Sequence, residues 1–368
     1  MRTIPLLALA SSSAALALPY AAVQDALLAA LDWAAPTAPN TLPGFCTVTS
    51  NGHDDTQALA DISKRCGKNG VITLPSKEYI ITKPVTLSLS NGYLSLKGWI
   101  TYTGDHLPSG TAALTLAGSN LALTSKDGGV RVTGDAVEGY ALHVKATNSA
   151  VTGFGVDSSG PGILVADVSN TDISGGTITA ASGVVVTRAS NMAINGITYT
   201  GVGDCVSVQA GTANVAVSDT ECRGAGVVID AAGEDVQIRN VAIGGVRVLP
   251  LDGAPPASGV RFQSTEDAWG QAANISIGVL EVEGATIPIA LDGANSAFSF
   301  HHVNVTDVSG TAGGAKVVQL HCSPAAPCHH WRFKHVDVKV EAARENYVCD
   351  NVPGLHVHHA AWECLPSQ

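Results

Sequence analysis

The stretch NMAINGITYTGVGDCVSVQAGTANVAV, residues 191–217, contains one full unit of a repeat and decides the fold. It begins with Asn191-Met-Ala-Ile194 and ends with Asn214-Val-Ala-Val217, so an Asn-x-x-(Ile/Val) pattern returns after 23 residues. Between the two copies, short β-prone segments are separated by Gly, Asn and Ser turn residues. A unit of this length that is all strand and no helix predicts a solenoid of stacked coils.

The repeat extends on both sides of this stretch. Asparagine versions occur at 148–151, 170–173 and 274–277, an aspartate version occurs at 235–238, and the last step contains the insertion PLDGAPPASG. We therefore expect an all-β, single-stranded parallel β-helix of about 10 coils, stacked at roughly the 4.8 Å spacing of paired strands. A second register runs in parallel and places five small residues at equivalent positions: Gly162, Gly183, Cys205, Gly226 and Gly259.

The segment DDTQALADISKRCG, residues 54–67, interrupts the strand pattern. Asp54 or Asp55 can cap a helix start, Leu59 and Ile62 share one face, and Gly67 follows the predicted end. Because a solenoid needs its open ends covered, we expect a short capping helix at the N-terminal end of the core.

The first residues have the composition of a targeting segment. An arginine precedes an apolar run in MRTIPLLALASSSAALALPYA, with Ala15-Leu16-Ala17 as a candidate cleavage site. We predict a signal peptide over residues 1–17, an Ala- and Pro-rich propeptide or linker over 18–44, and the β-helix domain over 45–368. The run is too short for a transmembrane anchor, so we expect a secreted, extracellular protein with no membrane partner.

The eight cysteines suit an oxidising compartment and fall in neighbouring pairs. The sequons Asn274-Ile-Ser276 and Asn304-Val-Thr306 predict a glycoprotein. Sequence alone allows 105 disulfide pairings, and proximity along the chain favours four local ones: Cys46–Cys66, Cys205–Cys222, Cys322–Cys328 and Cys349–Cys364.

Composition and charge limit the partners. An apolar content of 45% is enough for a large core, and the formal net charge of −11 disfavours nucleic acid. No Cys-x-x-Cys pair is present, and the His356-Val-His358 pair has no other residues at ligand spacing. We therefore expect a monomer with no metal and no cofactor.

Several stretches are similar to glycoside hydrolase family 28, the polygalacturonases and rhamnogalacturonases. The resemblance covers most of residues 45–364 and implies a right-handed, pectin lyase-like β-helix. It also implies a pectic polysaccharide of the plant cell wall as partner and hydrolysis of its backbone, usually with inversion. The matching stretches are CTVTSNGHDDTQALADISKRCGKNGVITLPSKEYII at 46–81, GDCVSV at 203–208, GVRFQS at 259–264 and CSPAAPCHHWRFKHVDVKV at 322–340.

The family has Asn-Thr-Asp, Gly-Asp-Asp, Gly-His-Gly and Arg-Ile-Lys signatures on successive coils. In the repeat register these fall on Ala-Ala-Ser at 180–182, Gly203-Asp204, Gly-Ala-Gly at 224–226 and Arg-Phe-Gln at 261–263. The resemblance thus leaves Asp204 as the catalytic candidate, with Arg261 and Gln263 as substrate-binding candidates. The letters Asn-Thr-Asp do occur at 170–172, but there the asparagine occupies the repeat turn.

Inverting hydrolysis needs a general acid and an opposed base. The resemblance places the acid at Gly203, which has no side chain, and a water-holding carboxylate at Ser182. Replacement carboxylates could come from Glu221, Asp230, or the pair Glu266 and Asp267. Among these, Glu266 is the preferred candidate, because the family's cleft lies along these coil ends.

Two functions remain open at this point. The first is a pectin-active hydrolase that works through an altered site, motivated by Asp204, Arg261 and the family match. The second is a catalytically inactive member that binds plant cell-wall polysaccharide, motivated by the lost acid at Gly203 and by Gln263. A neutral amide in place of the family's lysine can bind a hydroxyl but cannot balance a uronate charge.

Overall fold

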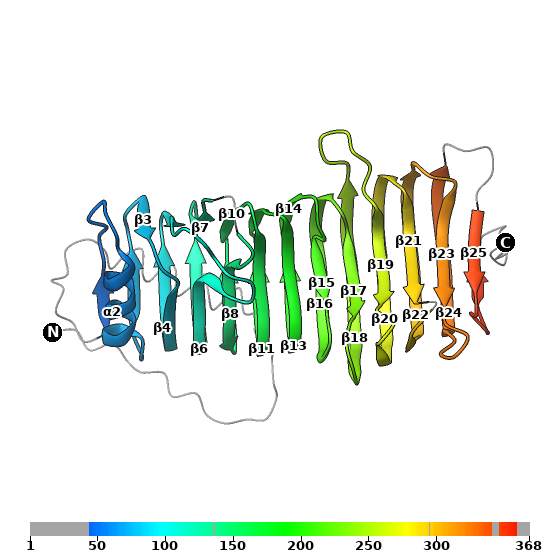
Figure 1. The fold of residues 1–368 in the computed structure, drawn as a ribbon, viewed down its shortest axis with the longest axis horizontal. Coiled ribbons are helices and arrows are strands. Elements are labelled where there is room, and N and C mark those ends of the chain that lie inside the picture. The colour runs from blue at the N-terminus through cyan, green and yellow to red at the C-terminus, as the bar shows by residue number, and fades with distance from the viewer. Residues whose placement is uncertain (1–43, 135–136, 294, 341–345, 359–368) are drawn as a thin grey trace, which may run out of the picture. The chain divides into compact units, whose positions relative to one another are not determined.

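The computed structural model describes residues 44–134, 137–293, 295–340 and 346–358. Their strands pair in parallel, each with the strand one coil before and one coil after it, as the repeat predicts. Figure 1 shows the resulting row of coils, from the blue strands beside α2 to the orange and red strands β23 and β25. The fold is therefore a right-handed parallel β-helix. The predicted signal peptide and nearly all of the predicted linker lie outside the described residues.

Each coil has three faces, and the first is the ladder face, which follows the asparagine turn. Together with the strands that continue onto it from the groove face, which are given below, it contains more strands than the ten coils expected. Four strands lie on this face alone: β1 (Phe45–Thr47), β2 (Val71–Leu74), β9 (Ser149–Thr152) and β26 (His356–His358). Five strands bend from this face onto the next: β16 (Thr212–Gly224), β18 (Val236–Leu249), β20 (Trp269–Ala285), β22 (Ala297–Ala312) and β24 (His329–Val340).

The second face is the back face. Besides the ends of those five bent strands, it contains β3 (Glu78–Ile81), β5 (Trp99–Tyr102), β7 (Gly129–Val132), β10 (Gly155–Ser158), β12 (Thr177–Thr179) and β14 (Thr198–Gly201).

The third face is the groove face. Seven strands belong to it alone: β8 (Tyr140–Thr147), β15 (Val206–Val208), β17 (Val227–Ala231), β19 (Ser258–Ser264), β21 (Ile287–Gly293), β23 (Lys316–Cys322) and β25 (Asn346–Asp350). Four strands continue from it onto the ladder face: β4 (Val85–Leu96), β6 (Ala112–Ser125), β11 (Pro161–Ser174) and β13 (Ser182–Asn195).

The core is a set of stacked side-chain files inside the coils. One file on the groove face consists of Val184, Val206, Val227, Val260 and Ile289, all at most 1% exposed. Toward the C-terminus the files become aromatic. The Phe262 ring lies 5.6 Å from the Phe300 ring and 5.1 Å from the Trp331 ring. Later coils therefore fill their interior with fewer, larger side chains.

The asparagine turns form a ladder of side-chain amides on the outside of the coils. Asn191 donates to Asn170 over 3.1 Å, and Asn214 donates to Asn191 over 2.9 Å. Every residue of the ladder has a left-handed backbone, with φ between 50° and 57°. Asparagine tolerates this conformation better than most residues, so the repeat is a conformational requirement as well as a hydrogen-bonding one. The ladder residues are Asn69, Asn91, Asn120, Asn148, Asn170, Asn191, Asn214, Asn240 and Asn274.

One repeat assignment was wrong. The residue equivalent to Asn214 is Asn240, which donates to it over 2.8 Å, and not Asp235. Asp235 also has a positive φ, 50°, but it starts a short extra segment whose Val236 pairs with Gly270 on the next coil. Both turns have the same local sequence pattern, and only the strand pairing shows which of the two belongs to the repeat.

The N-terminal helix α2 (Thr56–Cys66) was predicted correctly in type and place. Asp54 accepts a hydrogen bond from the Thr56 N–H over 3.0 Å, while Leu59 and Ile62 are buried against the first coil. Among the described residues, no helix is long and apolar enough to cross a membrane.

Three of the predicted disulfides are present. Cys46 is joined to Cys66, and the other two pairs are Cys205–Cys222 and Cys322–Cys328. Cys349 is also disulfide-bonded, and its predicted partner Cys364 lies outside the described residues.

Candidate functional site

Outward-facing polar side chains line up across consecutive coils of the groove face. We call this set the groove row. Because neighbouring strands lie about 4.8 Å apart, the row presents a regular series of polar groups along the solenoid. Its members, in coil order, are Gln209, Asp230, Gln263, Asp292, His321 and Asp350.

Asp204 lies in the turn just before β15, at the start of the groove face. The Arg261 Nη2 atom, from β19, donates to both of its carboxylate oxygens over 2.9 and 3.1 Å. Burial raises the pKa of Asp204 above its ordinary value, and the Arg261 charge offsets only part of that effect. Burial and the Arg261 charge thus act on the pKa of Asp204 in opposite directions, as is common for proton-transfer groups.

Asp230 is the second carboxylate of this site. Gln263 donates to one of its oxygens over 2.9 Å, and Gln209 donates weakly to the other over 3.4 Å. Burial is the main cause of the raised pKa of Asp204, and the charge of Asp230 on the adjacent coil adds to it. The preference for Glu266 as the replacement carboxylate is not supported. Glu266 is exposed in the turn after β19, whereas Asp230 lies within the site.

Gly203 cannot be replaced by an acid without local rearrangement. A Cβ atom there would lie 2.4 Å from the Ala181 carbonyl oxygen, closer than real contacts allow. The buried Tyr199 hydroxyl lies within hydrogen-bonding distance of the Ala181 and Gly203 carbonyl oxygens and packs under the turn. The backbone therefore leaves no room for a side chain at position 203, where the family resemblance places the acid.

Backbone pairing places the signature positions side by side, as the repeat register predicts. Gly183 N–H donates to the Asp204 carbonyl, Cys205 N–H to the Gly226 carbonyl, and Gly226 N–H to the Ser258 carbonyl. The two substrate-binding candidates both already have protein partners. Arg261 is paired with Asp204, although its buried Nε has no partner among the described residues, and Gln263 is bonded to Asp230.

Two other candidate groups lie away from the groove row. Glu221, one of the candidate replacement carboxylates, lies on the back-face part of β16, where it forms an ion pair of 2.8 Å with Arg223. Asn170 belongs to the asparagine ladder, which confirms the interpretation of Asn-Thr-Asp at 170–172 as a repeat turn.

In the last coils, histidines occupy the turn positions that asparagines have in the ladder. His302 and His330 have the same left-handed φ, 55° and 58°, and their rings stack 4.6 Å apart. His301 Nε2 lies 2.9 Å from Gln271 Oε1, which can only accept, so this nitrogen carries a proton. His301 Nδ1 therefore accepts from His302 Nδ1 over 2.9 Å when His301 is neutral.

The described residues contain no group of three or more His, Cys, Asp or Glu side chains placed to hold a metal ion. His356 and His358 are exposed at the ends of β26.

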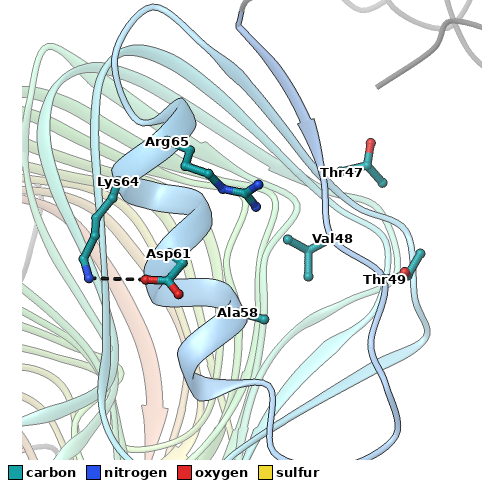
Figure 2. Close-up of a pocket in the computed structure, with 7 residues that line it drawn as sticks. All are labelled: Thr47, Val48, Thr49, Ala58, Asp61, Lys64 and Arg65. Atoms are coloured by element: carbon teal, nitrogen blue, oxygen red, sulfur yellow. Dashed lines mark hydrogen bonds and ion pairs between the residues drawn. The ribbon is translucent and has the colours of Figure 1, made fainter. Parts of the chain in front are cut away.

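A cavity of about 650 Å³ lies at the N-terminal cap, away from the groove row. Figure 2 shows it between α2 and the segment that carries Val48, with the side chain of Arg65 extending from the helix toward that segment. Its charged lining includes the ion pair Lys64–Asp61 at 3.3 Å. Nothing in its lining provides a pair of interacting carboxylates, so we assign the candidate site to the groove row.

Sequence reasoning named Asp230 as a candidate but preferred Glu266, and it missed the clash at Gly203. Asp230 lies on β17, at the same place relative to Gly226 that Gln263 has relative to Gly259. That spacing was a usable signal. The clash at Gly203 depends on the closeness of two coils, for which the sequence has no signal.

Comparison with known proteins supports the family assignment. The model of glycosyl hydrolases family 28 matches residues 138–361, which is more than half of the chain. A polygalacturonase of Cryptomeria japonica is 23% identical over 177 residues, 44% of this chain and 34% of that protein. The match thus spans about a third of this plant relative. An exopolygalacturonase of Rhizopus delemar is 24% identical and matches more fully, over 84% of this chain and 89% of that protein.

Solved structures agree with the fold. A polygalacturonase from Erwinia carotovora superposes with a TM-score of 0.62 at 12% identity, over 88% of this chain and 99% of that one. An endo-xylogalacturonan hydrolase from Aspergillus tubingensis has a TM-score of 0.60 at 17% identity, over 86% and 100% of the two chains. With the family model matched across the coils that contain the groove row, this chain belongs to glycosyl hydrolases family 28.

Proposed function

We propose that this protein hydrolyses glycosidic bonds in a pectic polysaccharide, with Asp204 and Asp230 as its two carboxyl groups. The observation that carries the proposal is their placement on adjacent coils of the groove face. Asp204 directly precedes β15, Asp230 lies on the paired strand β17, and β19 contacts both through Arg261 and Gln263. Two interacting carboxyls are the minimum for acid–base hydrolysis of a glycoside. Family membership supplies the substrate class.

The environments of the two groups suit different roles. Asp204, whose pKa burial raises, donates the proton to the leaving glycosidic oxygen. Asp230, whose oxygens are oriented by Gln263 and Gln209, takes a proton from the attacking water. Arg261 then stabilises the carboxylate that Asp204 becomes after proton donation.

A second function is favoured by one specific observation. Gly203 has no room for the family's acid, and Arg261 already contacts both oxygens of Asp204. A protein with this arrangement can bind a polysaccharide without cleaving it. The alternative is therefore a catalytically inactive binder of plant cell-wall polysaccharide.

One experiment separates the two functions. Purified protein is incubated with polygalacturonate, methyl-esterified galacturonan, rhamnogalacturonan and xylogalacturonan, and new reducing ends are measured. Turnover that Asp204→Asn lowers by about 10²–10⁴-fold supports the hydrolase. The absence of turnover on every polymer, together with binding that Arg261→Ala weakens, would establish the inactive binder.

We also propose that the protein is secreted after loss of residues 1–17 and is glycosylated. Disulfides suit an oxidising compartment, and both Asn274 and Asn304 are exposed. The test is a mobility shift of the secreted protein on treatment with an amidase that removes N-glycans. No shift in the wild-type protein would exclude glycosylation at both sites.

A further inference from the structure

The central part of the groove face is acidic. Strands β15, β17, β19 and β21 contain a single basic residue, Arg261, and two acidic ones, Asp230 and Asp292. Asp204, in the turn before β15, adds a third acid and is the ion-pair partner of Arg261. The charge of the one cation is therefore already balanced within the protein, and two carboxyl groups are left over.

The polar groups that face a ligand here are hydrogen-bonding groups without positive charge. Gln263 stands where the resembled signature has a lysine, and it is tied to Asp230 over 2.9 Å. The Asp292 side chain is exposed, and its carboxylate makes no hydrogen bond or ion pair with the residues that the structure describes. Carboxylate and amide groups accept and donate hydrogen bonds well, but neither attracts a uronate carboxylate.

Exposed apolar side chains border the same face. Val202, 82% exposed, precedes β15, and Trp269, 47% exposed, follows β19 across a four-residue turn. Of the described residues, only Phe45 and Val279 are comparably exposed large apolar side chains. An exposed indole ring provides a flat apolar surface with a polar edge, which suits the C–H face of a pyranose ring.

The proline-rich insertion stands at the entry to β19. Leu251 and Ala254 exchange two backbone hydrogen bonds, 3.2 and 2.8 Å, and close a short hairpin that projects beyond its neighbours in Figure 1. A hypothetical Cβ on Gly224 would lie 3.9 Å from the Leu251 side chain, so the hairpin base packs beside the coil that follows Asp204. The insertion thus projects from the solenoid on the Asp204 side of the groove face.

From these features we infer that the groove face binds an uncharged stretch of a pectic chain and discriminates against free polygalacturonate. Gln263 and Asp292 set this preference. The uncharged stretch is either methyl-esterified galacturonan or a neutral-sugar run such as galactan. The inference rests on the proposed function, because it concerns the same site.

The test is a binding comparison between one methyl-esterified galacturonan and its saponified product of equal length, with galactan as a third polymer. We expect wild-type protein to bind the esterified polymer or galactan about tenfold or more tightly than the saponified polymer. Gln263→Lys and Asp292→Lys shift the preference toward the saponified polymer. Asp292→Lys alters an exposed side chain with no partner, so it tests the inference without disturbing folding.

The matched control is Glu283→Lys, which makes the same charge change at an exposed position on the back face of β20. It leaves the preference unchanged. Tighter binding and cleavage of the saponified polymer by wild-type protein would overturn the inference and leave the proposed function standing. Equal effects of Glu283→Lys and Asp292→Lys would also overturn it. Failure to bind any of the three polymers would overturn the inference, whereas the proposed function is decided separately by the release of reducing ends from all four pectic polymers. Tighter binding of galactan than of esterified galacturonan identifies the neutral-sugar source.

Discussion

Phe262 and Gln263 are neighbours on β19, yet they belong to two regions that follow different rules. Phe262 points inward, is fully buried and packs against aromatic rings of the next coils. Gln263 points outward and bonds to Asp230 on the coil before. Inside, each side chain must fit the coils above and below it. Outside, a side chain need not fit the coils above and below it, so the groove row can change its chemistry while the fold persists.

The largest expected difference between the two regions is in stability. Phe262→Ala removes a buried ring from a cluster with no exposed surface, and we expect a loss of about 3–5 kcal/mol in the free energy of unfolding. Gln263→Ala, one residue away, should cost about 1 kcal/mol or less. Urea unfolding of both variants checks the contrast. Similar losses in the two would show that the groove row is part of the core.

The asparagine ladder should have an intermediate effect. Asn191→Ala removes two amide hydrogen bonds and puts alanine at φ 53°, so we expect a loss of about 1–2 kcal/mol. Asn195→Ala is the control, since Asn195 is on the same coil and bonds to Ser218 but has no left-handed backbone. If both variants lose the same amount, the left-handed turn contributes nothing.

The ion pair in the site should contribute less to stability. Arg261 and Asp204 have side-chain exposures of 37% and 29%, so a coupling of about 1 kcal/mol is expected from a double-mutant cycle. The cycle compares Arg261→Ala, Asp204→Asn and the double variant by thermal unfolding. A coupling energy near zero would mean that the contact seen between them does not persist in solution.

The smallest effect is a pH dependence at the end of the ladder. Burial, together with the charges of His302, His329 and His330, lowers the pKa of His301. A histidine with a lowered pKa binds fewer protons folded than unfolded. Stability is therefore fully present above the ordinary pKa of about 6.5 and is lost as pH falls toward the lowered value. Thermal unfolding at pH 7 and pH 5 should show the lower midpoint at pH 5.

A matched variant tests whether the histidines cause this loss. The double change His302→Asn and His330→Asn continues the asparagine ladder into these coils and removes two of the neighbouring charges. We expect the difference between pH 7 and pH 5 to shrink in this variant. An unchanged difference would assign the pH dependence to other groups.

The sequence predicts the interior and the turns well, because both repeat. Stacking forces equivalent residues at equivalent positions, and the left-handed turn favours asparagine, so the β-helix and most of its register follow from the sequence. Proximity along the chain predicted the three disulfides. The error at Asp235 arose because two left-handed turns occur in one coil. The correct motif, Asn240-Val-Ala-Ile243, was present in the sequence five residues later.

The outside of the coils is harder to predict. Which acid lies near Asp204 depends on where each strand ends: Asp230 lies on β17, whereas Glu266 lies in the turn beyond the end of β19. The replacement of asparagine by His302 and His330 also breaks the pattern on which the repeat search depended. Functional positions are least predictable here because the fold places no requirement on them.

The central claim is that Asp204 and Asp230 act as a pair on an otherwise ordinary β-helix. The most direct test is the rate of reducing-end release by wild-type protein and by Asp230→Asn, on the pectic polymer that the wild type cleaves fastest. We expect the rate to fall by about 10²–10⁴-fold, with the free energy of unfolding changed by less than about 1 kcal/mol. Equal rates in the two proteins would contradict the account.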